Sequence, residues 1–196
     1  MRKSAKKKVV EIGYEDLSAV GKPVRVQKLL EQYGPLVKLD IGCGEHPQEG
    51  FIGIDVQAFK DHKIIQHDIE TYPWPLPSGS ISLAMASHVV EHISRANFGF
   101  VKFMNEVWRV LKPGAQFMIS APYGLSALYI QDPTHQNPIN ENIWHYFDPL
   151  SAANFYRFYR PAPWKTVNCV FNVEGFIEVV LEKRRNDPSY GYKEQD

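Results

Sequence analysis

The chain of 196 residues has few cysteines and no excess charge of either sign. Its two cysteines, Cys43 and Cys169, stand outside any C-x-x-C pair, which argues against a disulfide framework and a cysteine zinc site. Lysine plus arginine and aspartate plus glutamate each number 22, so no net field favours a nucleic-acid backbone or an anionic membrane. The composition therefore gives no argument for a nucleic-acid partner, and it fits a reducing compartment.

Long apolar runs are also missing. The opening "MRKSAKKKVV" is basic but lacks the apolar stretch of a signal peptide, and no later segment approaches the length of a membrane span. We expect a soluble, cytoplasmic protein with no membrane partner. An apolar share of 44% is enough for one core. We expect a tail and a helix near "VRVQKLLEQY" in residues 1–34, and a single domain in residues 35–196; the sequence leaves the oligomeric state open.

Five short apolar runs follow, each bounded by turn residues, which is typical of strands covered on both faces in a parallel sheet. They span residues 36–42, 51–56, 63–69, 81–87 and 115–122. Between the last two, "NFGFVKFMNEVWRVLKPG" repeats its apolar residues at helical spacing, and Pro113-Gly114 is expected to end that helix. A helix between strands implies a right-handed crossover, so the pattern predicts a doubly wound α/β fold.

The last third of the chain has a different composition. Residues 123–164 are rich in aromatics, proline and asparagine, and we expect a cap-like insert that includes a helix near "PLSAANFYRFY". The segment "KTVNCVFNVEGFIEVVLEKRR" then predicts two antiparallel strands joined by a turn at residues 172–175.

A glycine-rich turn, "LDIGCGEH", closes the first predicted strand. Gly42 and Gly44 allow a close backbone approach to a ligand. The dinucleotide-binding fingerprint requires a third glycine where Pro47 stands, and no G-K-[ST] follows for a P-loop. The turn therefore favours neither a nicotinamide cofactor nor a nucleoside triphosphate.

An acidic residue lies at or just before the end of each of the first three predicted strands: Asp40, Asp55 and Asp68. In a parallel sheet these ends border one crevice, the usual ligand site of such folds. Three carboxylates repel a phosphate but suit a cationic amino group, a ribose diol and an adenine amine. The alternative is that these aspartates cap helices and turns, as many do.

Four stretches in order, "VKLDIGCG", "FIGIDV", "IIQHDIETYPWPLPSGSISLAMASHVVEHI" and "EVWRVLKPGAQFMISAP", give the sequence a family resemblance. It resembles the class I S-adenosylmethionine-dependent methyltransferases of the type 11 kind. The resemblance implies a mostly parallel, seven-stranded Rossmann-like sheet with a C-terminal antiparallel hairpin, and S-adenosyl-L-methionine as the cofactor. Phe51 follows Gly42 by nine positions, so the first crossover helix must be very short or absent.

The resemblance also implies that residues closing the first four strands bind the cofactor. Asp40 would lie near the ammonium, Asp55 would accept the two ribose hydroxyls, and Asp68 would accept the adenine amine. The whole set is Asp40, Gly42, Gly44, Asp55, Asp68, Ile69 and Ser87.

The stretch "SHVVEHI" spells H-x-x-E-H with His88, Glu91 and His92, the order in which one class of zinc hydrolases offers its ligands from a helix. We expect residues 88–93 to begin a helix on which the two imidazoles share a face. A zinc-dependent hydrolase is therefore an alternative, with His135 or Asp132 as a further ligand. The family pattern accounts for "VVEHI", so the leading interpretation places no metal and gives Glu91 and His92 a structural role.

The expected acceptor is a hydroxyl of a small molecule or glycan. His135 is the candidate base, His88 could orient the acceptor or take its proton, and Tyr123 directly follows the fifth strand. The alternatives are a packing role for His135 and a solvated cap for His88. Enzymes that methylate base amines usually carry [DNS]-P-P-[YFW] where this chain reads "SHVV". A third interpretation is a non-catalytic module that binds S-adenosylmethionine.

Overall fold

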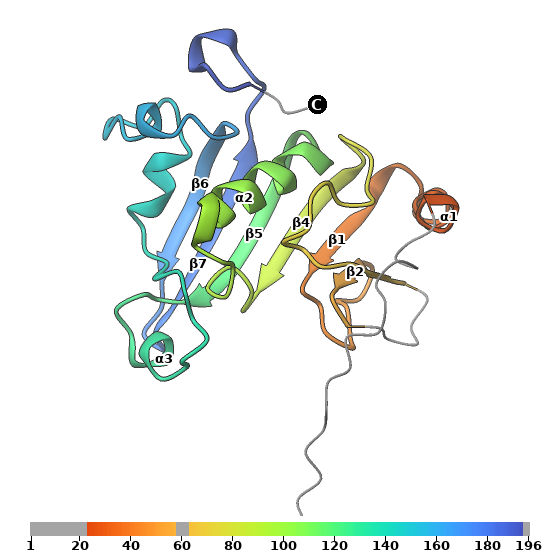
Figure 1. Cartoon of the computed structure of the whole chain (residues 1–196), viewed down its shortest axis with the longest axis horizontal. Helices are drawn as coiled ribbons and strands as arrows, with labels where there is room; N and C mark the ends of the chain where they lie inside the picture. Colours follow the sequence, from red (N-terminus) through yellow and green to blue (C-terminus); the bar gives the residue numbers. More distant parts are fainter. Residues whose placement is uncertain (1–22, 58–62, 194–196) are drawn as a thin grey trace, which may run out of the picture.

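The computed structural model describes residues 23–57 and 63–193, and the predicted N-terminal tail lies outside them. The predicted first helix is α1, Pro23–Tyr33. One seven-stranded sheet, in the order β3-β2-β1-β4-β5-β7-β6, organises the chain (Figure 1). Its strands are β1 Lys38–Ile41, β2 Ile52–Asp55, β3 Ile64–Gln66, β4 Ile81–Ser87, β5 Leu111–Pro122, β6 Trp164–Phe171 and β7 Phe176–Lys183.

Strands β1 to β5 pair in parallel, whereas β7 pairs antiparallel with both β5 and β6. The strand order turns back at β1, which lies between β2 and β4, so the switch point of a doubly wound sheet falls there. The predicted α/β class, the seven strands and the C-terminal hairpin are confirmed. No helix in residues 23–57 and 63–193 combines the length and apolarity needed to cross a membrane.

The first crossover contains no helix. Residues 42–51 form turns, and the Gly42 N–H donates to the Ile54 carbonyl at 2.8 Å, which holds the turn against the end of β2. This agrees with the short spacing in the sequence. The residues that follow β1 therefore stay at the carboxyl edge of the sheet.

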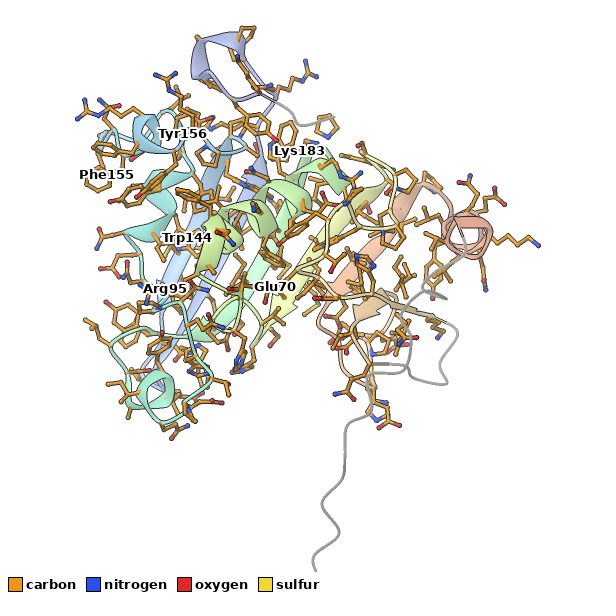
Figure 2. All side chains as sticks on the ribbon, viewed as in Figure 1. Glu70, Arg95, Trp144, Phe155, Tyr156 and Lys183 are labelled. Atoms are coloured by element: carbon orange, nitrogen blue, oxygen red, sulfur yellow. The ribbon has the colours of Figure 1, made fainter. Side chains whose placement is uncertain are left out.

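Helix α2, Gly99–Val110, crosses one face of the sheet beside β4 and β5 (Figure 1). It buries Phe103, Met104 and Val107 completely. The helix ends before Pro113-Gly114, which instead lie inside β5 where its pairing with β4 shifts register. Near the helix C-terminus the ammonium of Lys183, labelled in Figure 2, donates to the Leu111 carbonyl at 2.7 Å and lies 3.8 Å from the Trp108 ring centroid.

The segment between β5 and β6 carries short helical turns rather than a full helix. They are α3 at Ala127–Ile130 and two 3₁₀ helices at Ile143–Tyr146 and Tyr156–Phe158. The helix predicted near "PLSAANFYRFY" is wrong, because Asn154 and Arg160 adopt φ of 55° and 46° and interrupt helical hydrogen bonding. The segment runs along the β6 and β7 side of the sheet and adds Trp144, labelled in Figure 2, to the core.

The helix predicted at residues 88–93 is also wrong, since these residues form a turn. His88 has a left-handed φ of 56°, which breaks continuity with β4. The side-chain amide of Asn137 donates to the carbonyls of Val90 and Ile93, and the backbone N–H of Asn137 donates to the Glu91 carbonyl. Carbonyls that a helix would use internally are thus satisfied by the following insert.

Candidate active site

Three acidic side chains lie at the carboxyl edge of neighbouring strands. Asp40 pairs in register with Gly53 of β2, Asp55 ends β2 opposite Gln66 of β3, and Asp68 follows β3 by two positions. Because β1, β2 and β3 are consecutive in the sheet, the sequence expectation that these acids follow neighbouring strand ends agrees with the topology.

Asp55 connects the glycine turn to the end of β2. Its Oδ2 accepts the Gly44 N–H at 2.9 Å, and its Oδ1 accepts the Gln57 N–H at 2.9 Å. Gly42 and Gly44 adopt φ of 66° and 59°, the left-handed region that glycine tolerates. Each carboxylate oxygen has a second lone pair, so Asp55 retains acceptor capacity for a diol.

Asp40 is almost fully buried beneath this turn, with 7% of its surface exposed. Its Oδ2 accepts the Gln48 N–H at 2.8 Å. Burial raises the pKa of the Asp40 carboxyl, and the Gln48 N–H partly opposes that rise. A bound ammonium beside Asp40 would favour the ionised form.

Asp68 shapes the turn after β3. Its Oδ1 accepts the Glu70 N–H at 2.9 Å, and its Oδ2 accepts the Thr71 hydroxyl at 3.2 Å. This is the turn-forming role that the sequence left open for the aspartates. The next residue, Ile69, is half-buried, and its carbonyl accepts the Trp74 indole N–H at 3.0 Å.

The turn after β4 packs directly on the glycine turn. Ser87 is exposed at the end of β4, and the His88 N–H donates to the Ser120 carbonyl of β5 at 2.9 Å. A Cβ atom placed on Gly42 would lie 2.5 Å from Val89 Cγ2. The two turns are therefore in van der Waals contact through a glycine that has no room for a side chain.

A cavity of about 270 Å³ lies on the far side of this second turn. Its walls come from the turn after β4, the end of β5, the region of α3 and the start of β7. Figure 1 shows α3 near the end of β5. The lining residues are His88, Glu91, His92, Pro122, Leu128, Gln131, Asp132, His135 and Phe176.

The cavity contains a buried carboxylate among imidazoles. Glu91 is fully buried, and burial raises its pKa, while its own backbone N–H and then the neighbouring His92, His88 and His135 oppose the rise. His88 Nδ1 lies 3.5 Å from Glu91 Oε1, and His135 Nδ1 lies 2.8 Å from the Tyr129 carbonyl oxygen. Two candidate catalytic residues, His88 and His135, therefore share this cavity.

Tyr123, the third candidate, lies elsewhere. Its hydroxyl donates to Glu141 Oε2 at 3.1 Å, and its ring packs 4.7 Å from that of Phe171. The hydrogen bond to Glu141 raises the pKa of the Tyr123 hydroxyl, which disfavours its ionisation. Among the described residues, the cavity lining does not include Tyr123. The leading sequence interpretation gave Glu91 a structural role, and only the zinc alternative placed it in a site; the structure places it in the wall of this cavity.

Residues 39–119 match the family described as "Methyltransferase domain". These residues form a methyltransferase domain of the class I S-adenosylmethionine-dependent kind. This match spans β1 to β5, and so includes the glycine turn, Asp40, Asp55, Asp68 and the turn after β4. No curated protein sequence matches the methyltransferase chain.

Solved methyltransferase structures share its fold. One from Archaeoglobus fulgidus, described as a SAM dependent methyltransferase, has a TM-score of 0.55 at 18% identity and covers 83% of this chain and 95% of its own. A mutant 16S rRNA (adenine(1408)-N(1))-methyltransferase from Catenulisporales acidiphilia has a TM-score of 0.53 at 16% identity, covering 85% and 93%. An S-adenosylmethionine dependent methyltransferase from Mesorhizobium loti has a TM-score of 0.50 at 15% identity, covering 83% and 98%.

The methyltransferase assignment fixes the cofactor as S-adenosyl-L-methionine and the activity class as methyl transfer. It gives no support to the zinc hydrolase alternative. That alternative needed His88, Glu91 and His92 on one helix, and these residues lie in a turn.

Proposed function

We propose that this methyltransferase transfers the methyl group of S-adenosylmethionine to a hydroxyl of a small-molecule or glycan acceptor bound in the cavity beyond β4. The cofactor lies along the carboxyl ends of β1 to β4. Its contacts come from residues already implied by the sequence: Asp40, Gly42, Gly44, Asp55, Asp68, Ile69 and Ser87.

The observation that carries this proposal is the contact between Gly42 and Val89. It joins the turn that faces the cofactor to the turn that bears His88 and Glu91. Donor and acceptor sites on the two sides of one short turn meet the main requirement of methyl transfer, an in-line approach of oxygen to the sulfonium methyl. A cavity of about 270 Å³ suits a small acceptor or one sugar unit of a larger one.

The chemistry needs an acceptor oxygen that loses its proton as the carbon–oxygen bond forms. His88 has 53% of its side chain exposed at the cavity entrance, whereas His135 has 6% exposed inside it. The Tyr129 carbonyl can only accept a hydrogen bond, so His135 Nδ1 carries the proton and Nε2 keeps its lone pair. These two imidazoles are the groups that orient the acceptor hydroxyl and receive its proton.

A hydroxyl acceptor is favoured over a base nitrogen. One solved neighbour is named as an rRNA adenine methyltransferase, but its likeness extends to the fold alone. After β4 this chain reads Ser87-His88-Val89-Val90 rather than a Pro-Pro-aromatic sequence, and its formal net charge is zero. Neither feature supports a nucleic-acid substrate.

Calorimetric titration with S-adenosylhomocysteine tests the cofactor half of the proposal. Asp55→Ala should lose at least about 2 kcal/mol of binding free energy, because a buried diol loses its charged acceptor. Asp187→Ala is the matched control, since Asp187 caps a distant exposed turn. Equal affinity of wild type and Asp55→Ala would remove Asp55 from the site.

Incubation of the protein and S-adenosylmethionine with pools of small hydroxyl compounds and glycans tests the acceptor half. A product that gains one methyl group, with loss of turnover in His135→Ala, supports the proposal. Tight S-adenosylhomocysteine binding without turnover on any pool would instead identify a non-catalytic binding module.

A further inference from the structure

One carboxylate and two imidazoles converge in the acceptor cavity. Glu91, His92 and His135 each offer one ligand atom, and these three atoms lie within 4.8 Å of one another. The rings of His92 and His135 are 4.7 Å apart between centroids. The turn after β4 supplies the first two residues, and the insert after β5 supplies the third.

Glu91 lacks the partners that a buried carboxylate normally has. It is fully buried, and neither carboxylate oxygen accepts a hydrogen bond from another residue among residues 23–57 and 63–193. His88 Nδ1 lies 3.5 Å from Glu91 Oε1. Buried carboxylates are generally hydrogen-bonded, paired or bound to a metal, because desolvation of an uncompensated charge costs several kcal/mol. The position of Glu91 therefore indicates a missing partner of positive charge.

The surrounding hydrogen bonds fix both imidazoles in the tautomer that a metal requires. His135 Nδ1 donates to the Tyr129 carbonyl at 2.8 Å, which leaves the Nε2 lone pair available. The Thr134 hydroxyl donates to Asp132 Oδ1 at 2.7 Å, so at 3.1 Å from His92 Nδ1 it acts as acceptor. His92 Nδ1 thus carries its proton, and Nε2 is again the free ligand. Outer partners of this kind orient metal-ligating histidines.

The donor set selects a class of ion. Imidazole nitrogens suit Zn²⁺, Fe²⁺, Ni²⁺ and Cu²⁺, whereas Mg²⁺ and Ca²⁺ prefer oxygen ligands. A tetrahedral zinc site separates its ligand atoms by about 3.3 Å. The three atoms here need to move closer by roughly 1.5 Å at most to reach that spacing. Three protein ligands leave at least one coordination position open to the cavity.

We infer that Glu91, His92 and His135 bind a divalent transition-metal ion whose open position coordinates the acceptor oxygen. The metal site stands on the geometry alone, whereas its role in catalysis rests on the proposed function. With its Nε2 bound to the ion, His135 acts as a ligand in place of the base of the proposed function, and the metal-bound acceptor hydroxyl releases its proton to solvent. A lone pair of that oxygen then forms a bond to the sulfonium methyl carbon. The carbon–sulfur bond breaks with its electron pair on sulfur, giving the methyl ether and S-adenosylhomocysteine.

This ligand set differs from the one that the sequence pattern offered. The H-x-x-E-H order places His88 in the metal site, but His88 is half-exposed and does not belong to the converging group. His135 takes its place because the insert folds back over the turn after β4. Our sequence-based expectation of no metal in a methyltransferase also gives way to this inference.

Metal affinity of the chelator-treated full chain is the primary test. Titration with Co²⁺, followed by its visible absorption and by calorimetry, should show one ion per wild-type chain. Glu91→Gln and His135→Asn should each weaken binding at least about tenfold. His145→Asn is the matched control, because His145 bonds Ser151 in another part of the insert, and its affinity should equal that of wild type. Absent stoichiometric binding, or equal affinity in all four proteins, would overturn the inference.

A second pair of variants tests the positioning role of Thr134. Thr134→Val removes the oxygen that accepts the His92 proton and should weaken Co²⁺ binding by about tenfold. Thr134→Ser keeps the hydroxyl and should restore wild-type affinity. A purely structural effect of the threonine methyl group would give the reverse order, with Ser impaired and Val intact.

S-adenosylhomocysteine titrations of the same samples separate the two proposals. Cofactor binding in wild type and in Glu91→Gln shows that both proteins are folded. Cofactor binding without Co²⁺ binding in wild type would overturn the metal inference and leave the proposed function standing. Co²⁺ binding without cofactor binding would overturn the proposed function and leave the metal site standing.

Discussion

The two sides of the turn after β4 satisfy their carboxylates in opposite ways. On the cofactor side, Asp40, Asp55 and Asp68 each accept at least one backbone N–H from a residue within eleven positions in the sequence. On the cavity side, Glu91 accepts no hydrogen bond from another residue within the described part of the chain. The three aspartates therefore have hydrogen-bond donors in the ligand-free protein, whereas Glu91 has none from another described residue.

This difference shows how each half is built. Short turns at strand ends supply their own N–H donors, so the cofactor rim is preorganised by local sequence. The cavity is assembled from the turn after β4 and a distant insert, and the insert contributes side chains rather than donors to Glu91. A site with such an uncompensated buried carboxylate lowers the stability of the ligand-free protein, and ligand binding offsets this cost.

The largest expected effect comes from a change that damages both sides together. Gly42→Ala should destabilise the protein by about 3 kcal/mol, because a positive φ adds to a clash with Val89. Gly44→Ala is the matched control. It has a similar φ but no atom within 4 Å of a new Cβ, so it should cost about 1 kcal/mol. Urea unfolding measures both, and equal losses would show that the Val89 contact carries no strain.

A smaller effect of opposite sign is expected on the cavity side alone. Glu91→Met should raise the unfolding free energy of the metal-free protein by about 1–2 kcal/mol, because an apolar side chain of similar volume replaces an uncompensated buried carboxylate. With saturating Zn²⁺ the order should reverse, since only wild type gains binding energy. Urea unfolding with and without Zn²⁺ measures this, and a less stable metal-free variant would mean that Glu91 is compensated in the free protein.

Most of the fold follows from local sequence. Apolar periodicity predicted α1, α2 and all seven strands, and the spacing from Gly42 to Phe51 predicted a first crossover without a full helix. The aspartates near the ends of consecutive strands predicted an acidic rim, because parallel topology alone brings strand ends together.

What the sequence did not predict depends on contacts between distant segments. Asn137 satisfies the carbonyls of residues 90 and 93, in place of the helix that the sequence analysis expected there. The hydrogen bond from His92 to Thr134 spans 42 positions. The cluster around Glu91 could therefore be recognised only after the insert had been placed over the turn.

The smallest expected effect concerns Asp40, whose stability and function should respond to pH with opposite signs. Burial raises the pKa of its carboxyl above the ordinary value of 3.8. Its contribution to stability is therefore complete below pH 3.8 and is lost as the pH rises through the raised pKa. Asp40→Asn does not titrate, so its stability relative to wild type should increase over that window in urea unfolding without cofactor.

Cofactor affinity should move the other way, because the ammonium of S-adenosylhomocysteine needs the ionised carboxylate. Asp40→Asn should bind more weakly than wild type at neutral pH, and the two affinities should converge as the pH falls through the raised pKa of Asp40. Calorimetric titrations across this range measure the convergence. A constant ratio of affinities would place the ammonium away from Asp40, and the burial of Asp40 would then be a feature of the fold. The cofactor side would in that case also contain a carboxylate that does not bind its ligand.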